Sequence, residues 1–171
     1  MRAACAILAA AALTACQSTP SEPARATAGL DPTKGNKTRG EATFEQRGDK
    51  VHVVIYVEGL KPGQEHGLHI HEAGDCSSGD GMSAKGHFNP FGKPHGHPGS
   101  AERHAGDLPA LKPGKDGRAK VDVEVDQISV TPGPGSIVNR AVIVHAQPDD
   151  YKTQPTGNAG ARLACGVIKP G

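Results

Sequence analysis

The stretch Val51-His52-Val53-Val54-Ile55-Tyr56-Val57 decides the fold class of this chain. It is a run of β-branched and aromatic residues, which favour strands, and Lys61-Pro62-Gly63 follows it as a turn signal. Residues 41–45 precede it across Arg47-Gly48-Asp49. We therefore expect two antiparallel strands joined by a tight turn at 47–49.

Outward from this hairpin, other segments have the character of short strands. Val121-Asp122-Val123-Glu124-Val125 alternates between apolar and acidic residues, which is typical of a strand with one buried face. Segments 140–145 and 165–168 are short apolar runs, and 24–30 is a weaker candidate for a first strand. No stretch has helical periodicity, and long segments rich in Gly and Pro separate the strands. The sequence predicts an all-β fold, a Greek-key barrel or sandwich with long active-site loops.

Composition narrows the class of function. The chain has 171 residues, which predicts one main domain, and 19 Lys and Arg against 18 Asp and Glu leave a net charge of only +1. Nucleic-acid binders need a basic surface, and two Tyr, three Phe and no Trp offer few rings for stacking on single strands. We therefore expect no nucleic-acid partner. Nine His are unusual and favour a metal-binding domain.

The N-terminus has the pattern of an export signal. Met1-Arg2 is followed by an apolar run, residues 3–15, that is shorter than the roughly 20 residues needed to span a bilayer. Leu13-Thr14-Ala15-Cys16 resembles a bacterial lipobox, in which the Cys becomes lipidated. An ordinary signal peptide with an incidental Cys is the alternative. Lipidation at Cys16 would anchor the protein stably to a membrane.

This pattern predicts three parts of the chain and a location. Residues 1–15 are the signal peptide, 16–35 a lipid-anchored flexible tether that includes the possible first strand, and 36–171 the folded domain. We expect an exported protein of the periplasm or cell envelope, lipid-anchored to a membrane.

Export leaves two cysteines in the folded domain. Cys5 leaves with the signal and Cys16 takes the lipid, so Cys76 and Cys165 remain. In an oxidising compartment they are candidates for a disulfide, with two free buried thiols as the alternative. The absence of a Cys-x-x-Cys motif argues against a redox-exchange role.

Seven potential metal ligands follow one another along the chain. His69-Ile70-His71 ends an extended segment, and alternate residues of a strand face the same side, so both rings can bind one ion. The other five are His87, His95, His104, Asp107 and His145. A carboxylate among imidazoles suits zinc, and imidazoles alone suit Cu(II). Spacing alone predicts a metal site without dividing the ligands between ions.

Several motifs closely resemble the copper–zinc superoxide dismutase family. They are Gly67-Leu68-His69-Ile70-His71-Glu72, Gly74-Asp75-Cys76, Gly86-His87-Phe88-Asn89-Pro90, Arg103-His104-Ala105-Gly106-Asp107-Leu108 and the segment 157–168. The resemblance covers about residues 41–168 in the family's order and implies that family's β-sandwich architecture.

The resemblance also implies a role for each site residue. Copper, one per subunit, would be held by His69, His71, His87 and His145, and zinc, one per subunit, by His87, His95, His104 and Asp107. His87 would bridge the two ions as an imidazolate and would be catalytic together with Arg162, which matches the family's active-site arginine. Asp149 matches a carboxylate linking a copper imidazole to a zinc imidazole, although its neighbour Asp150 is one position away. Cys76 and Cys165 match the family's disulfide.

The implied activity is the disproportionation of superoxide to dioxygen and hydrogen peroxide, protecting the cell envelope. The alternative is a non-enzymatic copper- and zinc-binding lipoprotein on the same fold, which would not need Arg162. The expected partners are superoxide as substrate and a membrane reached through Cys16, while a homodimer and a monomer both fit the sequence. We expect His52 and His66 to be structural, His97 to be a solvated loop residue and Lys152 to be an exposed lysine.

Overall fold

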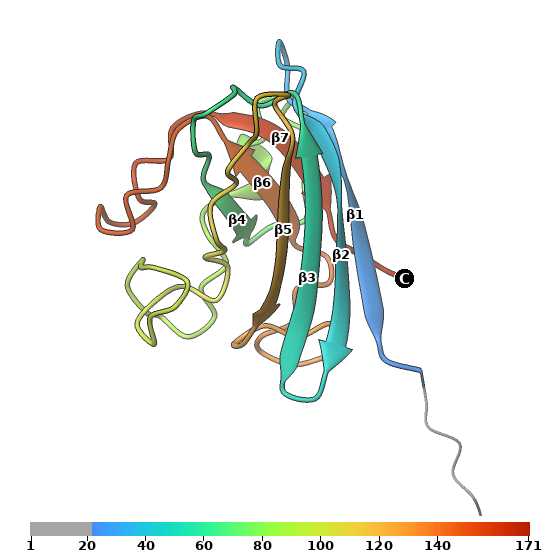
Figure 1. Cartoon of the computed structure of the whole chain (residues 1–171). Coiled ribbons are helices and arrows are strands. Elements are labelled where there is room, and N and C mark those ends of the chain that lie inside the picture. The colour runs from blue at the N-terminus through green and yellow to red at the C-terminus, as the bar shows by residue number, and fades with distance from the viewer. Residues whose placement is uncertain (1–21) are drawn as a thin grey trace, which may run out of the picture.

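The computed structural model describes residues 22–171, which form eight strands and one short 3-10 helix (Figure 1). The strands are β1 (Arg25–Pro32), β2 (Arg39–Arg47), β3 (Lys50–Glu58), β4 (Leu68–His71), β5 (Ala119–Val125), β6 (Ala141–His145), β7 (Arg162–Val167) and β8 (Lys169–Pro170), and the helix η1 is Met82–Ala84. The described part of the chain contains no α-helix, so the all-β prediction is confirmed. The predicted signal peptide and Cys16 lie outside the described residues.

The strands form one curled antiparallel sheet (Figure 1). Its order is β4-β6-β7-β1-β2-β3-β5, and β8 pairs with β1. Several neighbours in the sheet, such as β3 and β5 or β4 and β6, are not consecutive in the chain. The chain therefore crosses from one side of the half-barrel to the other, as Greek-key folds do.

The predicted hairpin consists of β2 and β3. Its register runs from Arg39 opposite Glu58 to Arg47 opposite Lys50, and Gly48 at the turn has a φ of 60°. Every second residue is buried in the barrel core, so that Phe44 packs against β3 with an exposed fraction of 1%. Burial of every second, mostly β-branched side chain produces the alternating pattern from which this strand was predicted.

The weak first-strand candidate is confirmed as β1, which pairs with β2, β7 and β8. The sheet thus begins before residue 36, inside the segment predicted as a tether. Small side chains gave this strand its weak pattern, and they allow a close approach. A Cβ atom on Gly166 of β7 would lie only 2.3 Å from the Gly29 carbonyl oxygen of β1, so the crossing requires glycine.

Strands β4 and β6 separate the barrel core from the loops. Leu68 and Ile70 of β4 belong to the main core together with Val142 and Val144 of β6. The residues between them face the opposite side, where the long loops 72–118 and 146–161 lie (Figure 1). Between residues 22 and 171 no helix has the length and apolar character needed to cross a membrane.

Candidate metal centre

Four buried histidines lie together on the loop side of β4 and β6. His69 and His71 come from β4, and His87 lies on the loop that follows this strand. His145 ends β6. One nitrogen of each ring lies within 4.8 Å of those of the other three, and the Nε2 atoms of His71 and His145 are 3.3 Å apart. The expectation that His69 and His71 face one side of a strand is therefore confirmed.

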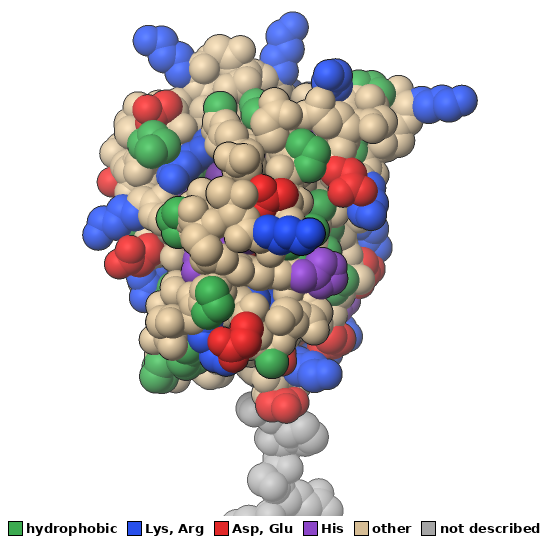
Figure 2. Space-filling model, turned by 90° about the vertical axis from the view of Figure 1, so that its left-hand side faces the viewer, with side chains coloured by type: hydrophobic (Ala, Val, Ile, Leu, Met, Phe, Trp, Pro, Cys, Tyr) green, Lys and Arg blue, Asp and Glu red, His purple; other side chains and the backbone are tan. Residues whose placement is uncertain are grey.

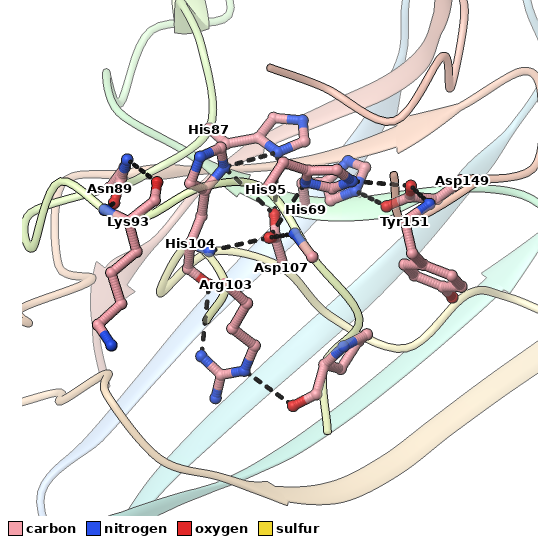
Figure 3. A network of polar contacts seen from close by, with 12 residues as sticks. His69, His87, Asn89, Lys93, His95, Arg103, His104, Asp107, Asp149 and Tyr151 are labelled. Carbon is pink, nitrogen blue, oxygen red and sulfur yellow. Dashed lines mark hydrogen bonds and ion pairs between the residues drawn. The ribbon is translucent and has the colours of Figure 1, made fainter. Parts of the chain in front are cut away.

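A second group lies beside the first and shares His87 with it. It contains His87, His95, His104 and Asp107, all on the segment 87–107, and its donor atoms also lie within 4.8 Å of one another (Figure 3). His87 Nδ1 is 3.0 Å from Asp107 Oδ1 and 3.4 Å from His104 Nδ1. His95 Nδ1 is 3.1 Å from Asp107 Oδ2. The structure thus brings together both sets of residues named from the sequence.

Two ring nitrogens in these groups, His69 Nδ1 and His87 Nε2, are buried without a hydrogen-bond partner. Leaving a buried polar atom unpaired costs about 1–3 kcal/mol, so such atoms are rare unless a ligand satisfies them. Each of these nitrogens belongs to a cluster of imidazole and carboxylate donors that zinc and copper ions accept. The residues present therefore fit two neighbouring metal ions.

Asp149 connects the two groups from behind. Its Oδ2 accepts a hydrogen bond from His69 Nε2 at 2.7 Å, and its Oδ1 accepts one from His95 Nε2 at 2.9 Å (Figure 3). These bonds hold a proton on each Nε2 and leave each Nδ1 free to bind a cation. Asp150 lies outside the site and accepts hydrogen bonds from Lys152 and Thr153. Of the two adjacent carboxylates, Asp149 is the one that contacts the histidines.

Burial keeps most of the imidazoles neutral. It lowers the pKa of His71 and His145 well below the usual value, and the neighbouring rings lower it further. Burial also lowers the pKa of His87 to about 4, although Asp107 opposes this shift. A protonated imidazolium cannot bind a metal ion, so these rings are kept out of the form that excludes metal.

His95 and the two carboxylates shift in the opposite direction. Burial lowers the pKa of His95, but hydrogen bonds to Asp107 and Asp149 outweigh it and raise the pKa to about 9. Burial raises the pKa of both carboxyl groups. Hydrogen bonds from histidines lower it by a larger amount, so each pKa lies below its usual range. Both carboxylates are therefore charged and attract cations.

Side chains hold the loop of the second group in place. Asp107 Oδ2 accepts hydrogen bonds from the backbone N–H of His104 at 2.9 Å and of Gly96 at 3.1 Å. The Gln154 side chain accepts from the His95 N–H at 2.8 Å and donates to the His95 carbonyl at 2.9 Å. The Gln154 contact is not visible in the sequence, because it joins two loops 59 residues apart.

Arg103 is a buried cation that ties the same loop to the barrel. Its guanidinium donates to the Pro98 carbonyl at 2.8 Å (Figure 3). It also pairs with the Asp126 carboxylate, which follows β5. Its exposed fraction is 2%, so these partners replace the water that it loses. The sequence places Arg103 directly before His104, within a motif shared with the family. The partners of Arg103 could not be predicted from that position.

Arg162 begins β7 beside the first group. Its Nη1 donates to the Gly81 carbonyl at 2.6 Å and its Nη2 to the Lys85 carbonyl at 2.5 Å. Burial lowers the pKa of Arg162 below its usual value, and Asp80 opposes the shift. The predicted disulfide is confirmed: Cys76 and Cys165 are bonded, which fastens the loop after β4 to the strand that carries Arg162.

The other histidines lie outside both groups. His52 binds Asp122 on the outer surface, and the buried His66 donates to the His145 carbonyl at 2.8 Å. His97 is exposed, with its ring against Tyr151. The structural roles expected for these residues agree with this placement.

Fold and site together define a β-barrel metalloprotein with two adjacent cation sites. The family model for copper/zinc superoxide dismutase matches residues 38–168. The chain belongs to the copper/zinc superoxide dismutase family, whose members use copper and zinc, and it is a superoxide dismutase.

Two similar proteins support this assignment. The chain is 48% identical over 137 residues to "Superoxide dismutase [Cu-Zn] 2" of Brassica juncea, covering 76% of this chain and 88% of that protein. It also resembles the crystal structure of the clock protein EA4, with a TM-score of 0.78 and 44% identity over 90% of this chain and 98% of that chain.

Proposed function

We propose that the protein disproportionates superoxide in the cell envelope, with His87 bridging two metal ions as an imidazolate. His69, His71, His87 and His145 would hold one copper ion per subunit. His87, His95, His104 and Asp107 would hold one zinc ion per subunit. Asp149 would orient His69 and His95, one ligand of each ion, and so keep the two sites in a fixed relation.

One observation carries the bridge: among residues 22–171, His87 alone belongs to both donor groups of four. Nδ1 lies 3.0 Å from Asp107, a member of the second group. Nε2 is buried without a partner, and the same ring stacks on His69 of the first group with centroids 3.8 Å apart. A ring with one nitrogen toward each group can bind two cations once both protons are lost, and metal charge favours that loss.

Bound copper supplies one-electron redox chemistry, taking an electron from one superoxide and returning it to another, while zinc supplies a fixed positive charge. Two superoxide anions and two protons give one dioxygen and one hydrogen peroxide. The protein must therefore attract an anion and deliver protons. His87 Nε2, buried without a partner, could hold a proton that the departing peroxide takes up.

Arg162 supplies the attraction for the substrate. Two carbonyl oxygens orient its guanidinium beside the first group, and no carboxylate in residues 22–171 forms an ion pair with it. Its charge is thus available to superoxide, a small anion. A metal-storage protein would not need such a group, so this arrangement favours an enzyme over a storage lipoprotein.

The proposed location rests on the N-terminal sequence. An apolar run, residues 3–15, followed by Cys16 favours export and lipid attachment, and a disulfide is typical of an oxidising compartment. Superoxide arising outside the cytoplasm would be removed there. Mass spectrometry of the mature N-terminus tests this proposal, since an unmodified residue at position 16 contradicts it.

Replacing His87 by Ala tests the bridge. We expect dismutation to fall at least about 100-fold, because the variant loses both the shared ligand and the proton carrier. Metal content and the rate of superoxide consumption should be measured on the same sample, so that loss of metal is separated from loss of turnover.

His97→Ala serves as the matched control, because it removes an exposed imidazole from a neighbouring loop. It should retain its activity and both metals. Wild-type turnover in His87→Ala with both metals bound would contradict the bridge. A fully loaded wild-type protein that consumes no superoxide would favour the storage function.

A further inference from the structure

The backbone of Lys85 has an unusual conformation. Its φ is 64° and its ψ is −146°, a region that side chains other than glycine rarely enter. The residue follows the short helix η1, and its N–H donates to the Met82 carbonyl at 3.0 Å. Strain of this kind persists where the surroundings impose it, and it is concentrated at functional sites.

The metal centre imposes this conformation through the Lys85 carbonyl. That oxygen accepts a hydrogen bond from His71 Nδ1 at 2.8 Å and another from Arg162 Nη2 at 2.5 Å. It therefore fixes the ring of a predicted copper ligand and the substrate-attracting guanidinium at once. Any residue at position 85 must direct its carbonyl in this way, and glycine would do so with the least strain.

The Lys85 side chain makes no ion pair within the described part of the chain that would offset the backbone strain. It is exposed, and no carboxylate among residues 22–171 forms an ion pair with its Nζ. Basic and acidic side chains are interspersed over the loop face, so no large patch of one sign dominates there (Figure 2). What distinguishes Lys85 from glycine is thus its positive charge, on the residue whose carbonyl binds Arg162.

We propose that Lys85 is a second guidance residue, which raises the encounter rate of superoxide with the site beside Arg162. This inference rests on the proposed function and extends it to a residue that neither the motifs nor the family match assign. A unit charge within about one Debye length of the site, roughly 10 Å at 0.1 M salt, should change the rate about two-fold at low ionic strength.

Three substitutions separate the charge from the strain. Lys85→Gln removes the charge and keeps a strained backbone, Lys85→Gly removes both, and Lys85→Arg keeps both. Lys50→Gln, at the exposed tip of the β2–β3 hairpin, makes the same change in net charge at a residue outside both donor groups and outside the loops 72–118 and 146–161. Each full-length, metal-loaded variant is assayed for its second-order rate constant with superoxide over a range of ionic strengths. Each metal-free variant is then unfolded thermally.

We expect Lys85→Gln and Lys85→Gly to lose about half of the rate at low salt and to show a shallower salt dependence. Lys85→Arg and Lys50→Gln should match the wild type. Lys85→Gly alone should raise the unfolding temperature, by about 3 °C, because it relieves the backbone.

Two results would overturn the proposal. If Lys85→Gln and Lys50→Gln have the same rate and salt dependence, the charge at position 85 does not guide the substrate. If Lys85→Gly does not gain thermal stability, the strain on which the inference rests is absent. Failure of the proposed function is distinguishable from both, since the loaded wild type itself would then consume no superoxide.

Discussion

The two donor groups of this protein are built on different kinds of structure. Three members of the first group, His69, His71 and His145, stand on strands β4 and β6. All four members of the second group lie on the segment 87–107, which contains no strand. Strands therefore carry most of the first group, whereas the second group is held by isolated backbone bridges from His87 and Asp107 to β4 and by side-chain contacts between loops. This difference predicts which substitutions will affect each metal.

The strand-borne group inherits its geometry from the ladder between β4 and β6. His69 lies opposite Ile143 and His71 opposite Ala141, so backbone hydrogen bonds fix the spacing of the rings. On the other side of the strands, Ile70 anchors the same ladder in the barrel core. These constraints do not depend on a bound ion.

Besides the backbone bonds of Phe88 and Gly106 to Ile70, the loop-borne group depends on a few polar side-chain contacts. Asp107 binds the backbone at His104 and Gly96, and Gln154 binds the backbone at His95. Each such contact contributes about 1 kcal/mol, and leaving a buried donor unpaired costs about 1–3 kcal/mol. The proposed zinc site should therefore be the more sensitive of the two to single substitutions.

The largest effect is expected for Asp107→Ala. It removes one donor of the second group and leaves two buried backbone N–H groups unpaired, so zinc affinity should fall at least about 1000-fold. Copper affinity should change less than about ten-fold, because three of the ligands proposed for copper stand on strands. Competition with a chelator, measured separately for the two metals, gives both values.

Asp122→Ala is the matched control, since it removes an exposed carboxylate from β5. Both metal affinities should remain at the wild-type value in this variant. Equal losses of copper and zinc in Asp107→Ala would show that the two groups do not differ in the way proposed.

The strands were predictable because burial at a period of two leaves a visible pattern. The hairpin of β2 and β3 has this pattern in full, whereas β1 shows it weakly because Ala26 and Ala28 contrast little with their neighbours. The donor residues were predictable from His-x-His alternation and from the family's motifs. Gln154 and Lys85 were not, because their roles arise from contacts between loops that no local pattern records.

The intermediate effect is expected for Ile70→Ala, which tests the strand side. Ile70 is fully buried in the barrel core, and its truncation should lower the free energy of unfolding by about 3 kcal/mol. Urea unfolding of the metal-free protein measures this loss. Copper affinity should change less than about three-fold while the protein stays folded, because the ladder to β6 keeps His69 and His71 in place. A much larger loss of copper would mean that core packing, and not the ladder, sets the spacing of the rings.

The smallest effect is expected for Gln154→Ala, which tests the loop side. It removes two hydrogen bonds from the His95 backbone, and zinc affinity should fall about ten-fold with copper affinity unchanged. The zinc affinity of Gln154→Glu should lie between those of Gln154→Ala and the wild type. A carboxylate can accept from the His95 N–H but cannot donate to the His95 carbonyl. Gln64→Ala is the counterpart on the strand side, because the Gln64 amide donates to the Ala146 carbonyl beside His145. If the sheet positions His145, that variant should retain its copper affinity; an equal loss in both variants would remove the distinction between strand and loop.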